Sequence, residues 1–105
     1  MGRSKDMIKT GGENVAAQEV EGCVIQCPGV RDAAAFGLPD DHLGELLAVA
    51  VETVEGMRPS EDDIRAFCRG RLAGFKVPKR VYFVARLPRS SSEKPQKFKL
   101  VEMFK

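Results

Sequence analysis

The stretch VRDAAAFGLPDDHLGELLAVAVETV, Val30 to Val54, decides the fold. Its second half, Leu46 to Val54, is β-branched and almost continuously apolar, which is typical of a central strand covered on both faces. Its first half, Val30 to Leu38, predicts a second strand, and Pro39-Asp40-Asp41 supplies turn chemistry between the two. Strands joined by a short polar loop predict an antiparallel pair with an elaborated connection.

Two helices are predicted on either side of this strand pair. Upstream, Asn14 is the expected N-cap of an amphipathic helix over Ala16 to Gln26, where apolar residues recur at helical spacing. Pro28-Gly29 ends that helix. Downstream, Ser60 is the expected N-cap of a helix with acidic residues in its first turn, and this helix should stop near Gly74.

The remaining elements complete an α+β domain. Asp6 to Thr10 predicts a strand that ends in a tight Gly11-Gly12 turn, since glycine tolerates positive φ angles. Lys79 to Ala85 predicts a third main strand, and Phe98 to Phe104 predicts one or two helical turns. The expected fold is therefore a small three-stranded sheet, mixed or antiparallel, with helices packed on it and a short β-hairpin before it.

Length and charge restrict the function classes. A chain of 105 residues with 43% hydrophobic and 30% charged residues suits one folded domain. A net charge of +2 argues against a dedicated nucleic-acid-binding protein. The positive charge gathers from Arg69 to Lys105, which favours a phosphate-bearing partner. No apolar run reaches the roughly 20 residues that cross a bilayer, and no signal peptide is evident.

The three cysteines, Cys23, Cys27 and Cys68, do not form a disulfide framework, because their number is odd and they are spread along the chain. His42 is the single histidine, so a zinc site lacks ligands and no metal site is predicted. Buried free thiols are the favoured interpretation. Such thiols fit a reducing, cytoplasmic location.

A self-contained active site is not evident from the residues alone. The chain has no GxxxxGK[ST] or GxGxxG phosphate-binding motif. The turn Gly11-Gly12-Glu13-Asn14 offers backbone amides to a ligand, although a plain strand-to-helix connection is the favoured interpretation of these residues taken alone. Lys94, in the segment SSSEKPQKFKL, offers a positive charge to developing phosphate charge, although a solvated surface lysine is the simpler interpretation.

Four ordered stretches, however, resemble the C-terminal domain of the adenylate-forming enzymes. This superfamily comprises acyl- and aryl-CoA synthetases, the adenylation domains of nonribosomal peptide synthetases, and firefly luciferase. The resemblance spans essentially the whole chain and is greatest to an AMP-forming acyl-CoA synthetase. The stretches are GRSKDMIKTGGENVAAQEVE (Gly2 to Glu21), CPGVRDAAAFGLPDDHLGELLAVAV (Cys27 to Val51), RLAGFKVPKRVYFVARLP (Arg71 to Pro88) and KPQKFKL (Lys94 to Leu100).

The resemblance implies a reaction in two steps. A carboxylate attacks ATP to give an acyl-adenylate and pyrophosphate, and the thiol of CoA then displaces AMP. The small C-terminal domain swings between the steps and presents a different face to a much larger N-terminal domain for each. Lys94 aligns with the adenylation lysine, on a loop over residues 89–97. Arg3 aligns with a residue near the ribose and phosphate of the nucleotide, and Lys5 with the hinge near residues 3–6.

The resemblance also implies two groups of residues for the second step. The loop that enters the site in the thioester conformation aligns with Lys9, Gly11, Gly12 and Glu13. The surface where some CoA ligases hold the CoA nucleotide aligns with Phe75, Lys76, Lys79 and Arg80, where aromatic and cationic groups suit adenine and the 3′-phosphate. The alternative for this second group is a core phenylalanine beside a solvated strand end.

One departure from the family pattern concerns the residue before Lys94. The family usually has glycine there, whereas this chain has Glu93, followed after the lysine by Pro95. Either Lys94 acts from a slightly reshaped loop, or adenylation is weakened. The retained register of Gln96, Phe98 and Leu100 favours the first account, with Phe98 and Leu100 anchoring the far side of the loop.

These observations predict the C-terminal domain of an AMP-forming acyl-CoA synthetase in fatty acid metabolism. The expected substrates are a carboxylate, ATP with Mg²⁺, and CoA, bound mainly by an N-terminal domain that this chain lacks, so the chain alone should be inactive. Two alternatives stay open. One is an adenylation domain that loads a carrier protein. The other is a non-catalytic interaction module, for which Glu93 is the main argument.

Overall fold

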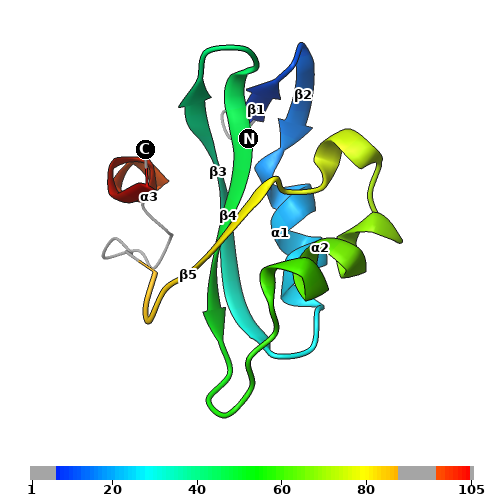
Figure 1. Ribbon diagram of the computed structural model, residues 1–105, viewed down its shortest axis with the longest axis vertical. Helices are drawn as coiled ribbons and strands as arrows, with labels where there is room; N and C mark the ends of the chain where they lie inside the picture. Colours follow the sequence, from blue (N-terminus) through cyan, green and yellow to red (C-terminus); the bar gives the residue numbers. More distant parts are fainter. Residues whose placement is uncertain (1–6, 88–96, 105) are drawn as a thin grey trace.

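The computed structural model describes residues 7–87 and 97–104 of the chain (Figure 1). Within these residues one five-stranded sheet is built around β4 (Gly44–Thr53). β3 (Val30–Asp40) pairs with β4 in antiparallel fashion, from Asp32 opposite Glu52 to Asp40 opposite Gly44. The centre of β4 is fully buried. The predicted strand pair and the central position of its second strand are confirmed.

The turn between β3 and β4 is closed by Asp40. Its Oδ2 accepts hydrogen bonds from the backbone N–H groups of His42, at 3.0 Å, and Leu43, at 2.8 Å. Gly44 follows with φ of +82°, a conformation that residues with a side chain rarely adopt. The predicted turn chemistry at residues 39–41 is therefore confirmed, and the turn is tighter than the elaborated connection expected.

The other edge of β4 is shared by two shorter segments. β5 (Arg80–Phe83) runs parallel to β4, so the sheet is mixed. β1 (Met7–Thr10) and β2 (Glu13–Ala16) form the hairpin, and β1 meets β4 through the pair Thr10 and Gly44. The α+β class is confirmed, and the hairpin expected before the sheet is joined to the three main strands in one sheet.

α1 (Ala17–Ile25) follows β2 without a connecting loop. The predicted N-cap role of Asn14 is wrong, because Asn14 pairs with Lys9 inside the hairpin and the N-cap position is Ala16, which makes no side-chain capping bond. Hairpin pairing therefore prevails over the capping preference of asparagine. The predicted helix itself is present, one residue shorter at each end than Ala16 to Gln26.

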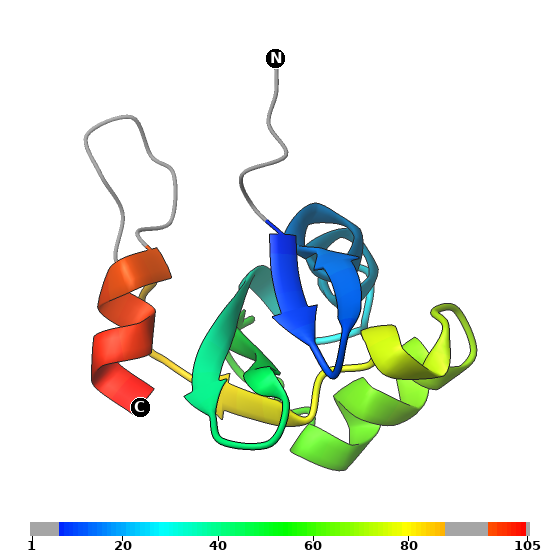
Figure 2. The same ribbon diagram turned by 90° about the horizontal axis from the view of Figure 1, so that it is seen from above.

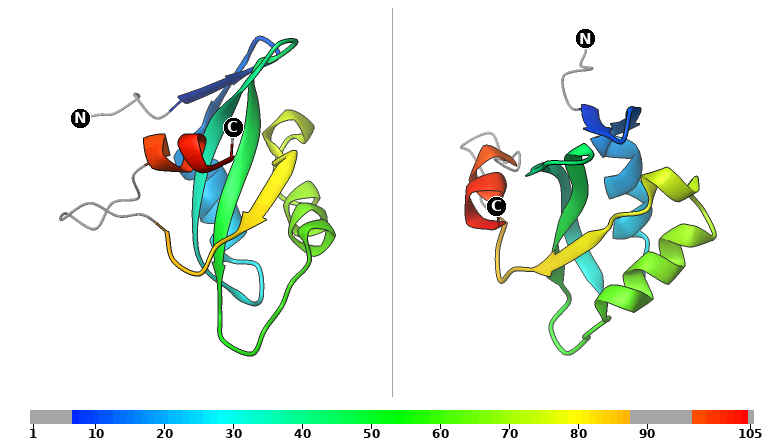
Figure 3. Two further views of the ribbon diagram at one scale, coloured as in Figure 1. Left: turned by 60° about the vertical axis from the view of Figure 1, so that its left-hand side comes forward. Right: turned by 45° about the horizontal axis from the view of Figure 1, so that its top comes forward.

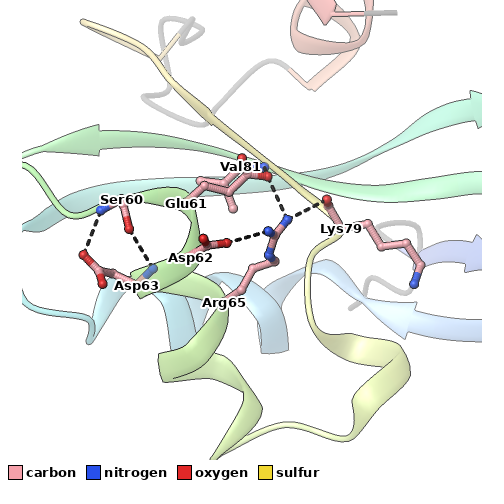
Figure 4. A network of polar contacts seen from close by, with 7 residues as sticks. All are labelled: Ser60, Glu61, Asp62, Asp63, Arg65, Lys79 and Val81. Carbon is pink, nitrogen blue, oxygen red and sulfur yellow. Dashed lines mark hydrogen bonds and ion pairs between the residues drawn. The ribbon is translucent and has the colours of Figure 1, made fainter.

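α2 (Glu61–Arg69) begins as the sequence predicts. Ser60 Oγ accepts from the N–H of Asp63, and the Asp63 carboxylate accepts from the N–H of Ser60, each at 3.0 Å (Figure 4). This reciprocal capping box satisfies two backbone donors that the first turn leaves without helical partners. The helix ends at Arg69, before the predicted stop near Gly74, where the short 3₁₀ helix η1 (Gly74–Lys76) begins.

Helices cover both faces of the sheet. α1 and α2 lie on one face and α3 (Lys97–Phe104) on the other (Figures 1 and 3). Under α3, the rings of Phe36, Tyr82 and Phe104 stack, with 4.0 Å between the centroids of Tyr82 and Phe104. The sheet thus separates two cores, which we call the α1–α2 core and the α3 core.

All three cysteines are buried free thiols in the α1–α2 core, as predicted. The sulfur atoms of Cys23 and Cys68 lie 3.8 Å apart between α1 and α2. Burial raises the pKa of Cys27, and burial with the neighbouring Cys23 raises the pKa of Cys68 from 9.0 to about 12. In the part of the chain that the structure describes, no cluster of His, Cys, Asp or Glu is arranged to hold a metal ion. No helix there has the length and apolar character needed to cross a membrane.

Candidate functional site

The predicted site residues divide into those the structure describes and those it does not. Arg3, Lys5 and Lys94, with Glu93, lie outside the described residues. Their roles in nucleotide binding, hinge motion and adenylation therefore stay predictions. The described site residues form two separate regions, the hairpin loop (Thr10–Glu13) and the cationic surface around η1 and the start of β5.

The hairpin loop presents two glycines whose conformation requires glycine. Gly11 has φ of +60° and Gly12 has φ of +84°. A Cβ atom at Gly12 would meet nothing within 4 Å, so the backbone there is open to an approaching molecule. Gly11 is instead held, because its N–H donates to the carbonyl of Leu43 at 2.9 Å. The loop is therefore accessible at its tip and fixed at its base, as close approach to a ligand requires.

The β3–β4 turn is the support for this loop. Figure 1 shows the two turns side by side at one end of the sheet, and the Gly11–Leu43 bond joins them. The N–H of Lys9 donates to Oε1 of Glu45 at 2.8 Å. Glu45 is a site residue that no sequence motif indicated, because its partner lies 36 positions away in the chain.

The cationic surface contains more residues than the sequence indicated. The core interpretation of Phe75 is wrong, because 41% of its surface is exposed. Lys79 and Arg80 are also exposed, and a shallow cavity of about 470 Å³ lies among these cations. Arg65 and Arg69 of α2 line the same cavity and were missed, because only folding brings α2 beside β5. The lining residues are Arg65, Arg69, Gly74, Val77, Pro78, Lys79 and Arg80.

Two cations of the cationic surface, Lys76 and Arg65, have acidic partners. Lys76 Nζ lies 2.8 Å from Oε1 of Glu19 on α1, so its charge is balanced within the fold. Arg65 contacts Glu61 and Asp62 at 2.8 Å each and donates to the carbonyl of Lys79 at 3.1 Å (Figure 4). Arg65 therefore positions the start of β5, and the exposed charges offered to a ligand are those of the other cations.

Described residues before and after the segment that contains Lys94 pack in the α3 core. Leu87 and Leu100 are 1% and 0% exposed, and both pack in that core. The carboxylate of Glu52, itself buried in β4, accepts a hydrogen bond from the N–H of Leu87. Leu100 is therefore the buried anchor that the sequence predicted, while the side chain of Phe98 lies outside the described residues.

The hairpin loop, the cationic surface and α3 occupy different parts of the described domain. Figure 2, seen from above, shows α3 on one side of the sheet and η1, α2 and the β1–β2 hairpin spread around the other. A domain built this way presents different chemical groups on different faces.

Comparison with known proteins identifies relatives of this architecture. Residues 19–94 match the family described as AMP-binding enzyme C-terminal domain. The chain is 43% identical over 97 residues to an oxalate–CoA ligase of Arabidopsis thaliana, covering 92% of this chain and 19% of that protein. It is 41% identical over 102 residues to the mitochondrial medium-chain acyl-CoA ligase ACSF2 of Rattus norvegicus, covering 97% and 17%.

Solved structures agree with these sequence relatives. The Mycobacterium tuberculosis fatty acyl CoA synthetase superposes with a TM-score of 0.89 at 42% identity, covering 97% of this chain and 20% of that one. The chain spans less than a fifth of the length of the two curated relatives. The similarity therefore concerns one domain of much longer enzymes.

Proposed function

Because this chain belongs to the family of AMP-binding enzyme C-terminal domains, we propose that it is the mobile C-terminal domain of an AMP-forming acyl-CoA ligase. In the first step a carboxylate oxygen attacks the α-phosphorus of ATP and pyrophosphate leaves. In the second step the sulfur of CoA attacks the acyl carbon of the adenylate, and AMP leaves with the carboxylate oxygen. The observation that carries the proposal is the family match together with relatives that are named CoA ligases.

Adenylation is assigned to Lys94 on the loop over residues 89–97. Its ammonium would stabilise the negative charge on the carboxylate and phosphate oxygens as pyrophosphate departs. The support is that two described leucines before and after this stretch of the sequence, Leu87 and Leu100, are buried in the α3 core. Arg3 is assigned to the nucleotide and Lys5 to the hinge near residues 3–6. Mg²⁺ accompanies ATP, held mainly by the N-terminal domain.

Thioester formation is assigned to the hairpin loop and the cationic surface. Lys9, Gly11, Gly12 and Glu13 would line the approach of the CoA thiol, supported by the open backbone at Gly12. Phe75, Lys79 and Arg80 would hold the CoA nucleotide, supported by their exposure. Lys76 is the weaker member of that group because Glu19 balances its charge.

The substrate and location are proposed at the level the relatives allow. The relatives are named for oxalate, medium-chain and fatty acids, so the reacting group is a carboxylate and the acid-binding pocket belongs to the N-terminal domain. Two of these names refer to fatty or medium-chain acids, which supports a place in fatty acid metabolism. The buried free thiols support a reducing compartment such as the cytoplasm.

The test is a pair of half-reaction assays on the full-length enzyme with Lys94→Ala. Carboxylate-dependent exchange of pyrophosphate into ATP should fall steeply, because the transition-state charge loses its counter-ion. Thioester formation from supplied acyl-adenylate should largely survive. Lys99→Ala is the matched control, since Lys99 is an exposed lysine on α3. Equal loss of both half-reactions in Lys94→Ala would contradict the assignment.

A further inference from the structure

Glu45 performs an unusual task for a residue at the start of a strand. The β1–β4 ladder contains a single residue pair, Thr10 opposite Gly44, so the next N–H along β1 lacks a backbone acceptor in β4. Oε1 of Glu45 supplies that acceptor, 2.8 Å from the N–H of Lys9. The bond is a charge-assisted hydrogen bond, and these are stronger than those between neutral groups. The Glu45 side chain thus extends the contact between β1 and β4 beyond their one backbone pair.

The carboxylate of Glu45 reaches this place because β3 leaves room for it. Glu45 lies opposite Pro39, and Gly37 lies two residues earlier on the same face of β3. A Cβ atom at Gly37 would stand 2.7 Å from Cδ and 2.8 Å from Oε2 of Glu45. φ at Gly37 is not in the left-handed region, so the backbone itself tolerates other residues there. A side chain at this position would therefore force the Glu45 carboxylate to move from the place where it accepts the Lys9 N–H.

The Glu45 bond acts together with the β3–β4 turn. Gly11 donates to the carbonyl of Leu43, whose own N–H is held by Asp40. The hairpin is thus joined to the main sheet at three consecutive points of β1 and its turn: Lys9, Thr10 and Gly11. Glu45 provides the side-chain contact among these three. Without it, the base of the hairpin loop depends on the Gly11–Leu43 hydrogen bond and the Thr10–Gly44 strand pair.

We propose that Glu45 is a positioning residue for thioester formation, with Gly37 as the gap that admits its side chain. The carboxylate fixes the backbone of Lys9 and thereby the placement of the hairpin loop relative to the sheet. Glu45 touches no reacting atom. The inference rests on the proposed function, in which this loop serves the second step only. Leu87, the last described residue before the Lys94 segment, packs in the α3 core and not at this contact, so we expect adenylation to be independent of Glu45.

The first test measures the contact itself on the 105-residue chain by hydrogen exchange of the Lys9 amide. Glu45→Ala should accelerate exchange severalfold, because the Lys9 N–H loses its acceptor and is left to water. Glu45→Gln should retain most of the protection, because the amide oxygen still accepts. Gly37→Ala should accelerate exchange although Glu45 is intact. Unchanged Lys9 exchange in both alanine variants would overturn the proposal.

Matched controls separate this effect from general loosening. Glu55→Gln changes an exposed glutamate in the loop after β4 and should leave Lys9 exchange unchanged. Gly22→Ala adds a methyl group on α1, where a Cβ meets nothing within 4 Å, and should also have no effect on it. If the Gly22 control accelerated Lys9 exchange as much as Gly37→Ala does, the specific role of the gap at residue 37 would be refuted.

The second test uses the two half-reactions of the full-length enzyme. In Glu45→Ala and Gly37→Ala, the maximal rate of thioester formation should fall by roughly tenfold, because misplacement by ~1 Å costs up to about 100-fold. KM for CoA and pyrophosphate exchange should stay near wild type, and Glu45→Gln should restore the rate. Wild-type enzyme lacking both half-reactions would overturn the proposed function, and this inference with it. A different result would overturn this inference alone. In that result the wild-type enzyme catalyses both half-reactions, and the alanine variants either keep both or lose both to the same extent.

Discussion

Glu45 and Glu52 stand near opposite ends of β4, and each accepts a backbone N–H from a segment far away in the sequence. Glu45 is partly exposed and holds Lys9 at the base of the hairpin loop. Glu52 is 7% exposed and holds Leu87, where the Lys94 segment leaves the α3 core. β4 thus supplies a carboxylate that holds the backbone of the hairpin loop and another that holds the backbone just before the Lys94 segment. The first carboxylate is partly exposed and the second is buried.

The difference between the two environments has a consequence for function. Water competes for a partly exposed N–H, so loss of the Glu45 bond leaves its donor solvated and costs little stability. A buried N–H has no such replacement, and its loss costs the desolvation of the donor as well. We therefore expect the hairpin loop to be adjustable at small cost, while the origin of the Lys94 segment is part of the folded core.

The largest expected effect comes from the buried end of the Lys94 segment. Leu100→Ala should reduce the free energy of unfolding by about 2–5 kcal/mol, the range for truncating a fully buried leucine. Leu100 is 0% exposed and packs in the α3 core. Met103→Ala on the same helix is the control and should change stability little, because Met103 is 55% exposed. Urea denaturation of the 105-residue chain measures both, and equal losses would refute the anchoring role of Leu100.

The next prediction compares the two glutamates directly. Glu52→Ala should cost about 1–3 kcal/mol of unfolding free energy, because it leaves the buried N–H of Leu87 without its acceptor. Glu45→Ala should cost about 1 kcal/mol or less, because water reaches Lys9. The measurement is the difference in urea midpoint between the two variants at unchanged slope. A larger loss for Glu45→Ala would break the proposed contrast between a buried and a partly exposed attachment.

How far the sequence predicted this arrangement depends on the range of the interactions. The apolar run of β4 and the Ser60 capping box were predictable, because burial pattern and capping are written in neighbouring residues. Asn14 was misplaced because pairing with Lys9 across the hairpin prevailed over its capping preference. In the sequence, Glu45 is one more polar residue beside a turn. Its structural role depends on contacts with Lys9 and Gly37, which form only in the folded sheet.

The cationic surface supports the same conclusion with a second set of residues. Lys79 and Arg80 were proposed from the family resemblance, whereas Arg65 and Arg69 join them only because α2 packs beside β5. The positions of charged residues in the sequence also do not show which cations form ion pairs in the folded domain. Lys76 is paired with Glu19, 57 positions away, and no local pattern indicates that contact.

The smallest expected effect concerns the α1–α2 core, which carries neither of the two β4 attachments. The Cys68 thiol has a pKa raised from 9.0 to about 12 in the folded state, chiefly by burial. The folded state therefore keeps this proton where the unfolded chain releases it. The stabilisation is fully present below pH 9 and is lost progressively as the pH rises towards 12.

Urea denaturation of wild type and Cys68→Ala at a series of pH values from 8 to 11 tests this, within the interval between 9.0 and about 12 that the two pKa values define. The wild-type free energy of unfolding should fall more steeply above pH 9 than that of the variant, because the variant lacks the group that titrates differently in the two states. Parallel curves would show that the Cys68 proton is not retained on folding. A steeper wild-type curve would locate alkaline weakening in the α1–α2 core, on the face of the sheet opposite α3 and the anchors of the Lys94 segment.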